Sequence, residues 1–187
     1  MKITAMLSLA LFCGLAGVTP AQTKAAASPT AVALNANFNG RWVGVLEYRD
    51  YSSNAQVFLP TWLTLTPAPD GHSVTLSYIY DDGPTKTVRE TSTLTLSPET
   101  SKATFNGSND KSPTSYDVQG FVEFAKTGRG MLLLTGKGIE NEKPVDVRIT
   151  LTMRRNLYTY RKETKLAGED FKFRDAYTFT RADPPSL

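Results

Sequence analysis

The sequence predicts an all-β protein built as an antiparallel up-and-down β-barrel of about ten strands. Thr, Val and Tyr recur in alternating runs after residue 37. Turn residues separate these runs at short intervals, as in Ala68-Pro69-Asp70-Gly71 and Asp81-Asp82-Gly83-Pro84. No segment shows a long amphipathic helical pattern, so the crossovers that parallel strands need are missing. A two-sheet sandwich is the main alternative architecture.

The N-terminal end of the chain has a different composition. Residues 1–21 place Lys2 before an apolar run and end in small residues at Ala21, which is the layout of a cleaved signal peptide. The apolar run is shorter than the ~20 residues that a membrane span needs. Residues 22–37 are rich in Ala, Thr and Ser, a composition that predicts a disordered linker. We therefore expect an exported protein, periplasmic or secreted, without a stable membrane anchor after cleavage.

Cysteine content and charge exclude several classes of protein. The single cysteine, Cys13, lies in the predicted signal peptide and follows Phe12, where bacterial lipoproteins carry a small residue, so no lipid anchor is expected. Removing 21 residues from the 187-residue chain leaves 166 residues without cysteine, enough to bury one core without disulfides. The 21 basic and 18 acidic side chains are nearly balanced and form no dense basic patch, so no nucleic-acid partner is expected.

A single barrel domain is expected over residues 38–183, followed by a tail over 184–187. The expected strands lie near residues 40–50, 55–66, 73–81, 85–96, 101–106, 114–125, 130–138, 143–153, 156–163 and 170–181. A meander of this length can close on itself and so remove its sheet edges. Pro60 predicts a bulge or an edge position in the second strand, and Gly120 permits a sharp bend in the sixth.

Closure predicts that one face of every strand lines a common interior. The alternation supplies such faces: Trp42, Leu46 and Tyr48; Val74, Leu76, Tyr78 and Tyr80; Tyr116, Val118, Val122 and Phe124; Val145, Val147, Ile149, Leu151 and Met153; and Phe171, Phe173, Tyr177 and Phe179. Trp62 has no assigned face, because a bulge at Pro60 would reverse the faces of its strand.

The two ends of the meander carry a distinctive pair of motifs. Gly40-Arg41-Trp42 opens the first strand and Phe179-Thr180-Arg181 closes the last. This pattern resembles the calycin group of barrels, meaning lipocalins and their fatty-acid-binding and nitrobindin-like relatives. The resemblance implies that Gly40 and Trp42 form a structural floor at the closed end of the barrel, with the Arg181 guanidinium over the indole; Arg174 is the weaker candidate. A guanidinium stacks well on an indole and is less strongly hydrated than an ammonium.

The pattern departs from each type within this group. Lipocalins usually have eight main strands and a C-terminal helix. Fatty-acid-binding proteins carry a helical lid between their first two strands, and residues 50–55 are too few to form it. A ten-stranded barrel without a lid is most similar to the nitrobindin-like type, which binds haem iron through a histidine. The single histidine here, His72, lies in a Gly-containing turn, where a solvated side chain is the commoner arrangement. We therefore expect neither a cofactor nor a metal.

Polar residues on inward faces are the remaining candidates for a functional site. Glu90 shares its face with Val88 and Ser92, and Asp175 lies between Phe173 and Tyr177. The candidate ligand-binding set is Tyr48, Tyr78, Tyr80, Glu90, Tyr116, Asp175 and Tyr177. An interior carboxylate must be paired or hydrogen-bonded, and the tyrosine hydroxyls can supply those bonds. In the alternative interpretation, a bulge turns the acids outward and the tyrosines fill the core.

The first strand ends in Arg49 and Asp50, held between Tyr48 and Tyr51. Trp42 and Asp50 are eight positions apart along one strand, so this pair is expected at the rim of the open end. An ion pair packed between aromatic rings is one interpretation, and a gate over the interior is the other.

Three functional hypotheses follow. The first is an exported barrel that binds a small apolar or amphipathic molecule in its interior. The second is a structural or interaction module with a filled barrel and no ligand. The third is a metal-free barrel enzyme that uses interior Glu, Asp and Tyr side chains. The sequence names neither the ligand nor the oligomeric state.

Overall fold

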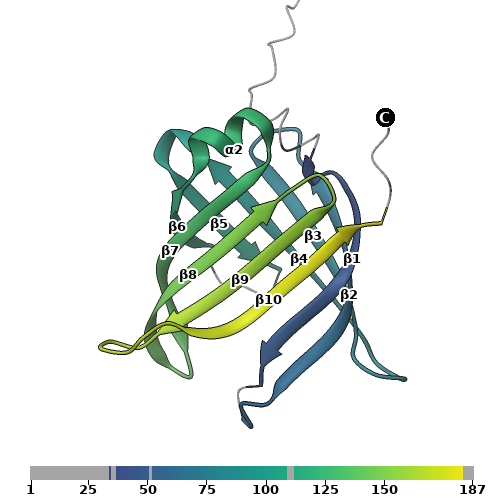
Figure 1. Ribbon diagram of the computed structural model, residues 1–187, viewed down its shortest axis with the longest axis vertical. Coiled ribbons are helices and arrows are strands. Elements are labelled where there is room, and N and C mark those ends of the chain that lie inside the picture. Colours follow the sequence, from purple (N-terminus) through teal and green to yellow (C-terminus); the bar gives the residue numbers. More distant parts are fainter. Residues whose placement is uncertain (1–33, 35–36, 51, 109–111, 183–187) are drawn as a thin grey trace, which may run out of the picture.

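The computed structural model describes residue 34 and residues 37–50, 52–108 and 112–182. Over this part, the chain forms a closed barrel of ten antiparallel strands, in which sequence neighbours pair and β1 also pairs with β10 (Figure 1). The strands are β1 (Gly40–Arg49), β2 (Gln56–Pro67), β3 (Ser73–Asp81), β4 (Thr87–Ser97), β5 (Lys102–Gly107), β6 (Thr114–Gln119), β7 (Gly130–Glu140), β8 (Lys143–Met153), β9 (Leu157–Lys165) and β10 (Lys172–Arg181). A 3-10 turn, η1 (Pro98–Thr100), and a helix, α2 (Phe121–Thr127), complete the described elements. The predicted fold class is confirmed, and the sandwich alternative is wrong.

One end of the barrel is closed by a packed floor. Trp42 is fully buried, and the guanidinium carbon of Arg181 lies 4.3 Å from the centre of the indole. Arg181 also donates hydrogen bonds to the backbone carbonyls of Asn37 and Asn39, at 2.6 and 2.7 Å, and to that of Arg155 at 3.2 Å. The guanidinium therefore covers the indole and joins the chain before β1 to β10 and to the turn between β8 and β9.

Gly40 provides the space for this arrangement. Its φ is +128°, and a Cβ at this position would lie 2.8 Å from Nη1 of Arg181. A residue with a side chain would strain the backbone and displace the guanidinium.

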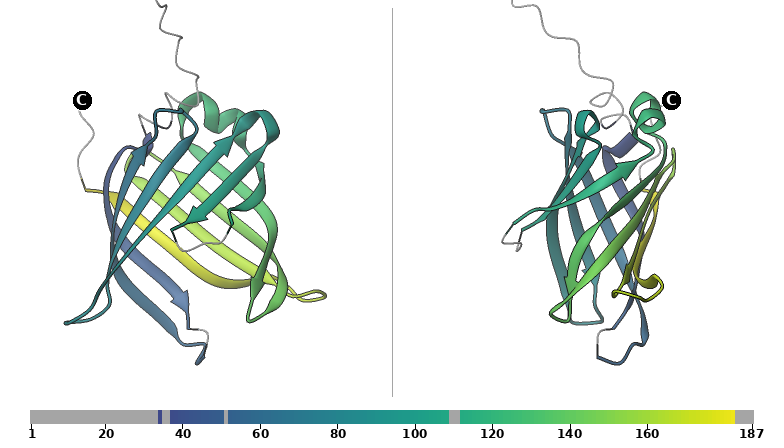
Figure 2. Two further views of the ribbon diagram at one scale, coloured as in Figure 1. Left: turned by 180° about the vertical axis from the view of Figure 1, so that it is seen from behind. Right: turned by 90° about the vertical axis from the view of Figure 1, so that its left-hand side faces the viewer.

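The described residues before β1, namely Leu34 and residues 37–39, cover the floor from outside the barrel together with the helix α2 (Figures 1 and 2). Phe38 packs edge-on against Phe124 of α2, with ring centres 5.8 Å apart. The side-chain amide of Asn37 donates a hydrogen bond to the carbonyl of Thr127, and Leu34 is buried. Leu34 and Asn37 belong to the expected linker, but at these two residues the segment is part of the core. The rest of residues 22–36 lies outside the described part of the chain.

The expected strand over 114–125 is wrong in its second half, where α2 forms. β6 ends just before Gly120, whose φ is 97°, and a Cβ there would lie 2.4 Å from the carbonyl oxygen of Met131. Phe121 and Phe124 are buried on one face of α2, and Val122 is exposed. Val122 and Phe124 therefore do not share an inward strand face, because the three-residue spacing of the two phenylalanines suits a helix. In the described part of the chain, no helix is long and apolar enough to cross a membrane.

A β-bulge divides β10 into two parts. The register with β9 shifts between Phe173 and Asp175. Before the bulge, the rings of Phe171 and Phe173 lie outside the barrel: the guanidinium of Arg161 covers Phe173 at 4.9 Å, and that of Arg148 covers Phe171 at 4.3 Å. The expected inward positions of Phe171 and Phe173 are therefore wrong, because one extra residue reverses the alternation. Beyond the bulge, Asp175, Tyr177 and Phe179 face inward as predicted.

β2 keeps one inward face along its whole length. Its register with β1 is continuous through Pro60, and pairing with β3 begins only at Thr61. Pro60 thus occupies an edge position, which was one of its two expected roles, and no bulge forms there. Trp62 lies on the outer face with 46% of its surface exposed.

Candidate functional site

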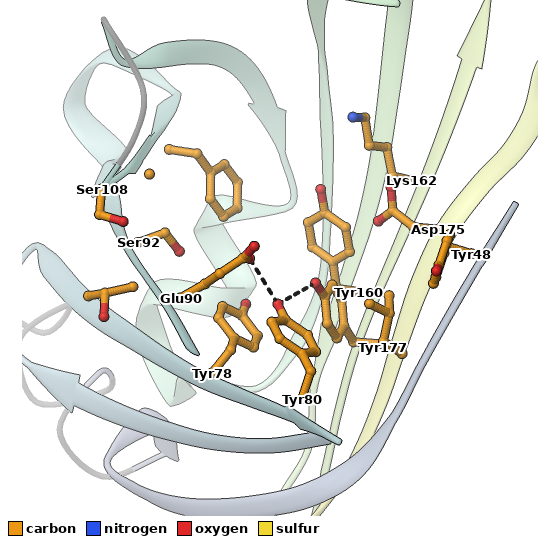
Figure 3. A pocket seen from close by; sticks show the side chains of 14 residues that line it. Tyr48, Tyr78, Tyr80, Glu90, Ser92, Ser108, Tyr160, Lys162, Asp175 and Tyr177 are labelled. Carbon is orange, nitrogen blue, oxygen red and sulfur yellow. Dashed lines mark hydrogen bonds between the residues drawn. The ribbon is translucent and has the colours of Figure 1, made fainter. Parts of the chain in front are cut away.

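The half of the barrel farthest from Trp42 contains a cavity of about 480 Å³ that opens at the mouth. Within a single strand, the inward side chains can be apolar in the half near the floor and polar in the half near the mouth. On β4, Leu94 and Leu96 are fully buried near the floor, whereas Glu90 lies at the mouth. The cavity is lined by Leu46, Tyr48, Tyr78, Tyr80, Glu90, Thr91, Ser92, Phe105, Gly107, Ser108, Tyr160, Lys162, Asp175 and Tyr177 (Figure 3).

Six of the fourteen residues that line the cavity are aromatic. Tyr78 and Tyr80, two positions apart on β3, are stacked with ring centres 5.8 Å apart and planes 7° from parallel. Tyr177 of β10 lies 5.2 Å from Tyr78 and meets Tyr160 of β9 edge-on at 5.8 Å. Phe105 of β5 packs edge-on against Tyr160 at 6.1 Å. Such a wall offers flat apolar area, and its tyrosine hydroxyls add polar contacts.

Two tyrosine hydroxyls form a hydrogen-bonded chain that ends at a carboxylate. The hydroxyl of Tyr80 donates to Oε2 of Glu90 at 3.3 Å and lies 3.0 Å from the hydroxyl of Tyr177 (Figure 3). Burial raises the pKa of Tyr80, and burial holds the pKa values of Tyr78, Tyr160 and Tyr177 well above their usual range. These phenols therefore remain protonated at neutral pH.

Asp175 is the second carboxyl group of the cavity and follows the bulge on β10. It is paired across the sheet with Lys162 of β9, and both side chains line the cavity. Burial raises the pKa of Asp175 to about 6, although the positive charges of Lys162 and Arg174 act in the opposite direction. A carboxyl group with such a pKa exchanges protons near neutral pH. We expected a tyrosine hydroxyl to donate a hydrogen bond to Asp175. Among the described residues, the groups that favour its ionised form are instead the charged side chains of Lys162 and Arg174.

An ion pair joins the bulge of β10 to the end of β7. Nε of Arg174, the residue at the bulge, lies 3.1 Å from Oε1 of Glu140, and each side chain is 15% exposed. Thr164 donates a hydrogen bond to the other oxygen of Glu140 at 2.8 Å, and Arg174 donates to the carbonyl of Arg49 at 3.4 Å. These contacts pair the buried charges and join β1, β7, β9 and β10 at the mouth.

The structure brings six of the seven candidate residues to the cavity: Tyr48, Tyr78, Tyr80, Glu90, Asp175 and Tyr177. The remaining one, Tyr116, packs into the core instead of lining the cavity. Its ring meets Phe105 edge-on at 6.0 Å and lies against Gly136, where a Cβ would be 2.7 Å from the tyrosine ring. Glycine at position 136 therefore provides the space that this ring occupies.

The expected ion pair between Arg49 and Asp50 does not form in the described part of the chain. Asp50 instead accepts hydrogen bonds from the hydroxyls and backbone amides of Ser52 and Ser53. These bonds, led by that from the Ser52 hydroxyl, hold the pKa of Asp50 below its usual range. Arg49 donates to the carbonyl of Asn54 at 3.4 Å. Both residues thus stabilise the turn between β1 and β2. Tyr51 lies outside the described residues.

Lys162 and Tyr160 line the cavity although neither was predicted to do so. On β9 the inward residues are Tyr158, Tyr160, Lys162 and Thr164, and the first and last of these are buried. Extending the alternation from the two tyrosines would have placed Lys162 inside. Its neighbours Arg161 and Glu163 make the segment look like a solvated run of charges.

Metal ligands are scarce in the described residues, where no group of three or more His, Cys, Asp or Glu side chains is arranged to hold an ion. His72 lies in the turn between β2 and β3, where its backbone amide donates to the Asp70 carboxylate at 2.8 Å. It does not belong to the cavity lining.

Comparison with known proteins shows a similarity of fold alone. No protein-family model matches the chain, and no curated protein matches its sequence. The S-type phycobiliprotein lyase CPES from Guillardia theta superposes with a TM-score of 0.52 at 11% identity, over 78% of this chain and 88% of that protein. Rv2717c from M. tuberculosis superposes with a TM-score of 0.55 at 14% identity, over 83% of this chain and 99% of that protein. The chain therefore has the fold of a calycin-like barrel, the group that its first and last strands resemble.

Proposed function

We propose that this protein binds a small apolar or amphipathic molecule in the cavity at the open end of its barrel. The observation that carries the proposal is a cavity of about 480 Å³ beside a fully packed floor in the same barrel. Ligand sites typically have roughly 300–1,000 Å³, mostly apolar walls and a few polar groups that fix orientation. Here the aromatic wall supplies the apolar area, and Glu90, Asp175 and Lys162 supply the polar groups. One of the proteins with a similar barrel is a phycobiliprotein lyase, which supports a small-molecule function for a barrel of this type.

The first test is native mass spectrometry of protein purified from its own host, in which a co-purifying ligand appears as an added mass. Ser92 lines the cavity, and its neighbour Thr93 lies on the opposite face of β4. Ser92→Phe should fill the cavity and abolish the added mass, whereas Thr93→Phe should retain it. Loss of the adduct in both variants, or in neither, would contradict binding in this cavity.

A filled interaction module is not favoured, because that hypothesis needs a packed interior. A metal-free acid–base enzyme is favoured by one observation: Asp175, with its pKa raised to about 6 by burial, lies in a cavity lined by tyrosine hydroxyls. The two functions differ in one readout. If the protein is an enzyme, Asp175→Asn should stop conversion of the co-purified molecule and still bind it. Conversion that survives in Asp175→Asn would remove Asp175 from any catalytic role.

Export is a separate proposal that rests on the composition of residues 1–21, which lie outside the described part of the chain. Intact-mass measurement of material secreted by its own host should show a chain without these residues. A retained Met1, or a lipid adduct on Cys13, would contradict the proposal.

A further inference from the structure

The hydrogen-bonded chain in the cavity has a fixed direction. A carboxylate only accepts hydrogen bonds, whereas a phenol has one proton to donate. Tyr80 directs its proton to Glu90, across 3.3 Å. The second contact of Tyr80, at 3.0 Å, must then be donated by Tyr177.

Tyr177 therefore presents an acceptor to the cavity. Its single proton is committed to Tyr80, and Tyr80 is its hydrogen-bond partner among the described residues. The side chain lines the cavity, so the free lone pair of its oxygen is available to a ligand. Burial and the contact with Tyr80 both raise the pKa of Tyr177, as expected for a phenol that keeps and donates its proton.

We propose that the cavity selects molecules with an aromatic or apolar body and a hydroxyl or N–H donor, and that this donor binds the Tyr177 oxygen. The inference rests on the proposed function and adds the chemical class of the ligand. An ether or carboxylate at the same place would oppose lone pair to lone pair and leave the Tyr177 lone pair without a donor, which is costly.

The charged side chains of the cavity also disfavour an anionic ligand. Its charged lining residues in the described part of the chain are Glu90, Asp175 and Lys162, so acids outnumber bases. A carboxylate ligand would meet Glu90 beside the Tyr80–Tyr177 chain. The cavity should therefore discriminate against fatty acids and other anionic amphiphiles.

Three probes with the same bicyclic body separate the effect of the hydrogen bond from the effect of charge: 2-naphthol, 2-methoxynaphthalene and 2-naphthoate. Their affinities for the purified chain are measured by fluorescence titration at neutral pH. We expect 2-naphthol to bind roughly 5- to 10-fold more tightly than its methyl ether, the effect of one hydrogen bond, and more tightly than 2-naphthoate. If none of the three binds, the proposed function fails. If the ether or the carboxylate binds as tightly as 2-naphthol, the function stands and the donor inference is overturned.

A substitution at Glu90 tests the direction of the chain itself. In Glu90→Gln, the new amide nitrogen can donate to Tyr80, so the chain can reverse and Tyr177 can donate to the ligand. The preference for 2-naphthol over its ether should then fall to within about twofold. Tyr80→Phe, which removes the acceptor of the Tyr177 proton, should have the same effect and serves if the first variant does not fold.

Glu47→Gln is the matched control, because Glu47 accepts a hydrogen bond from Gln56 and does not line the cavity. This variant should retain the preference of the natural chain. An unchanged preference in both Glu90→Gln and Tyr80→Phe would overturn the assignment of direction.

Discussion

The closed and open halves of this barrel are built from the same strands. The interior of the closed half is filled with side chains, whereas the interior of the open half holds a cavity. On β4, Leu94 and Leu96 are fully buried at the closed end, whereas Glu90 faces a cavity at the open end. On β10, Phe179 is buried beneath the floor and Asp175 lines the cavity. The alternation of a strand decides which side chains face inward, and their size and polarity decide whether the interior is filled.

This division separates stability from recognition. Apolar side chains at the closed end contribute buried area and dispersion contacts, so their loss leaves holes that the fold cannot easily close. Polar and aromatic side chains at the open end are arranged around empty volume, so substitutions there should change binding more than folding. Four experiments test the contrast.

The largest effect is expected at the floor. Trp42→Ala should lower the free energy of unfolding by roughly 3–5 kcal/mol, because a large, fully buried side chain is removed. Urea unfolding followed by circular dichroism measures this. Trp62→Ala is the control, since Trp62 is 46% exposed on the outer face and its loss should cost below about 1 kcal/mol. Similar losses at the two tryptophans would show that the floor is not the stabilising half.

Two substitutions on the inward face of β4 measure the contrast within a single strand. Leu94→Ala should cost roughly 2–5 kcal/mol, since Leu94 is fully buried. Val88→Ala should cost below about 1 kcal/mol, because Val88 lies at the mouth, beside the cavity. The same denaturation experiment serves for both. Equal costs would mean that the mouth is as well packed as the floor.

Asp175 should make stability depend on pH in the direction opposite to most carboxylates. Its pKa in the folded chain is about 6, against an ordinary value of 3.8, so the folded state holds the proton more strongly than the unfolded state. The ionised carboxylate therefore destabilises the fold; this cost is absent below about pH 4, grows between about pH 4 and 6, and is constant above that. Asp175→Asn should be more stable than the natural chain by roughly 1–3 kcal/mol at neutral pH, with the difference vanishing near pH 4.

Asp70 provides a control of opposite sign. Hydrogen bonds from the His72 amide and from Ser73 lower the pKa of Asp70, so its ionised form stabilises the fold, and this contribution is lost as the pH falls through the folded-state pKa. Asp70→Asn should therefore be less stable than the natural chain at neutral pH and approach it in acid. A pH-independent difference for Asp175→Asn would show that its carboxyl group is solvated in the folded chain.

The smallest effect on stability is expected for Glu90→Gln. Glu90 lies at the mouth and is largely exposed, so the free energy of unfolding should change by less than about 0.5 kcal/mol. Ligand preference should change nonetheless, as argued above for the Tyr80–Tyr177 chain. A large loss of stability would mean that Glu90 supports the fold and not only the ligand.

Patterns that are local in sequence predicted most of the barrel. Alternation and turn residues located all ten strands, and the spacing of Gly40, Trp42 and Arg181 indicated which strands meet at the floor. The predicted structure was wrong where the local conformation depends on residues that are distant in the sequence. The bulge at Arg174 is visible only in the pairing of β10 with β9, and α2 is too short for a helical period to stand out from an alternating one.

The cavity itself could not be predicted from local sequence patterns. Strand parity placed Glu90 and Asp175 inside, yet parity says nothing about how much space remains between facing walls. Tyr116 is an example. Strand alternation places it on the inward face, but its ring occupies the space that Gly136 leaves free and so packs into the core instead of lining the cavity. Volume depends on pairs of residues brought together by the fold, such as these two.

The hydrogen bonds from Arg181 of β10 to the residues before β1 also have a consequence for folding. Arg181 holds the carbonyls of Asn39 and Asn37 across separations of 142 and 144 positions, so the contacts that close the floor are among the longest-range in the chain. Such contacts are formed at a high cost in loop entropy and slow the search for the native topology. Until β10 pairs with it, β1 has one edge unpaired, which is the state in which strands associate with one another. We therefore expect the unfolded chain to need chaperones or dilution until Arg181 has closed the floor.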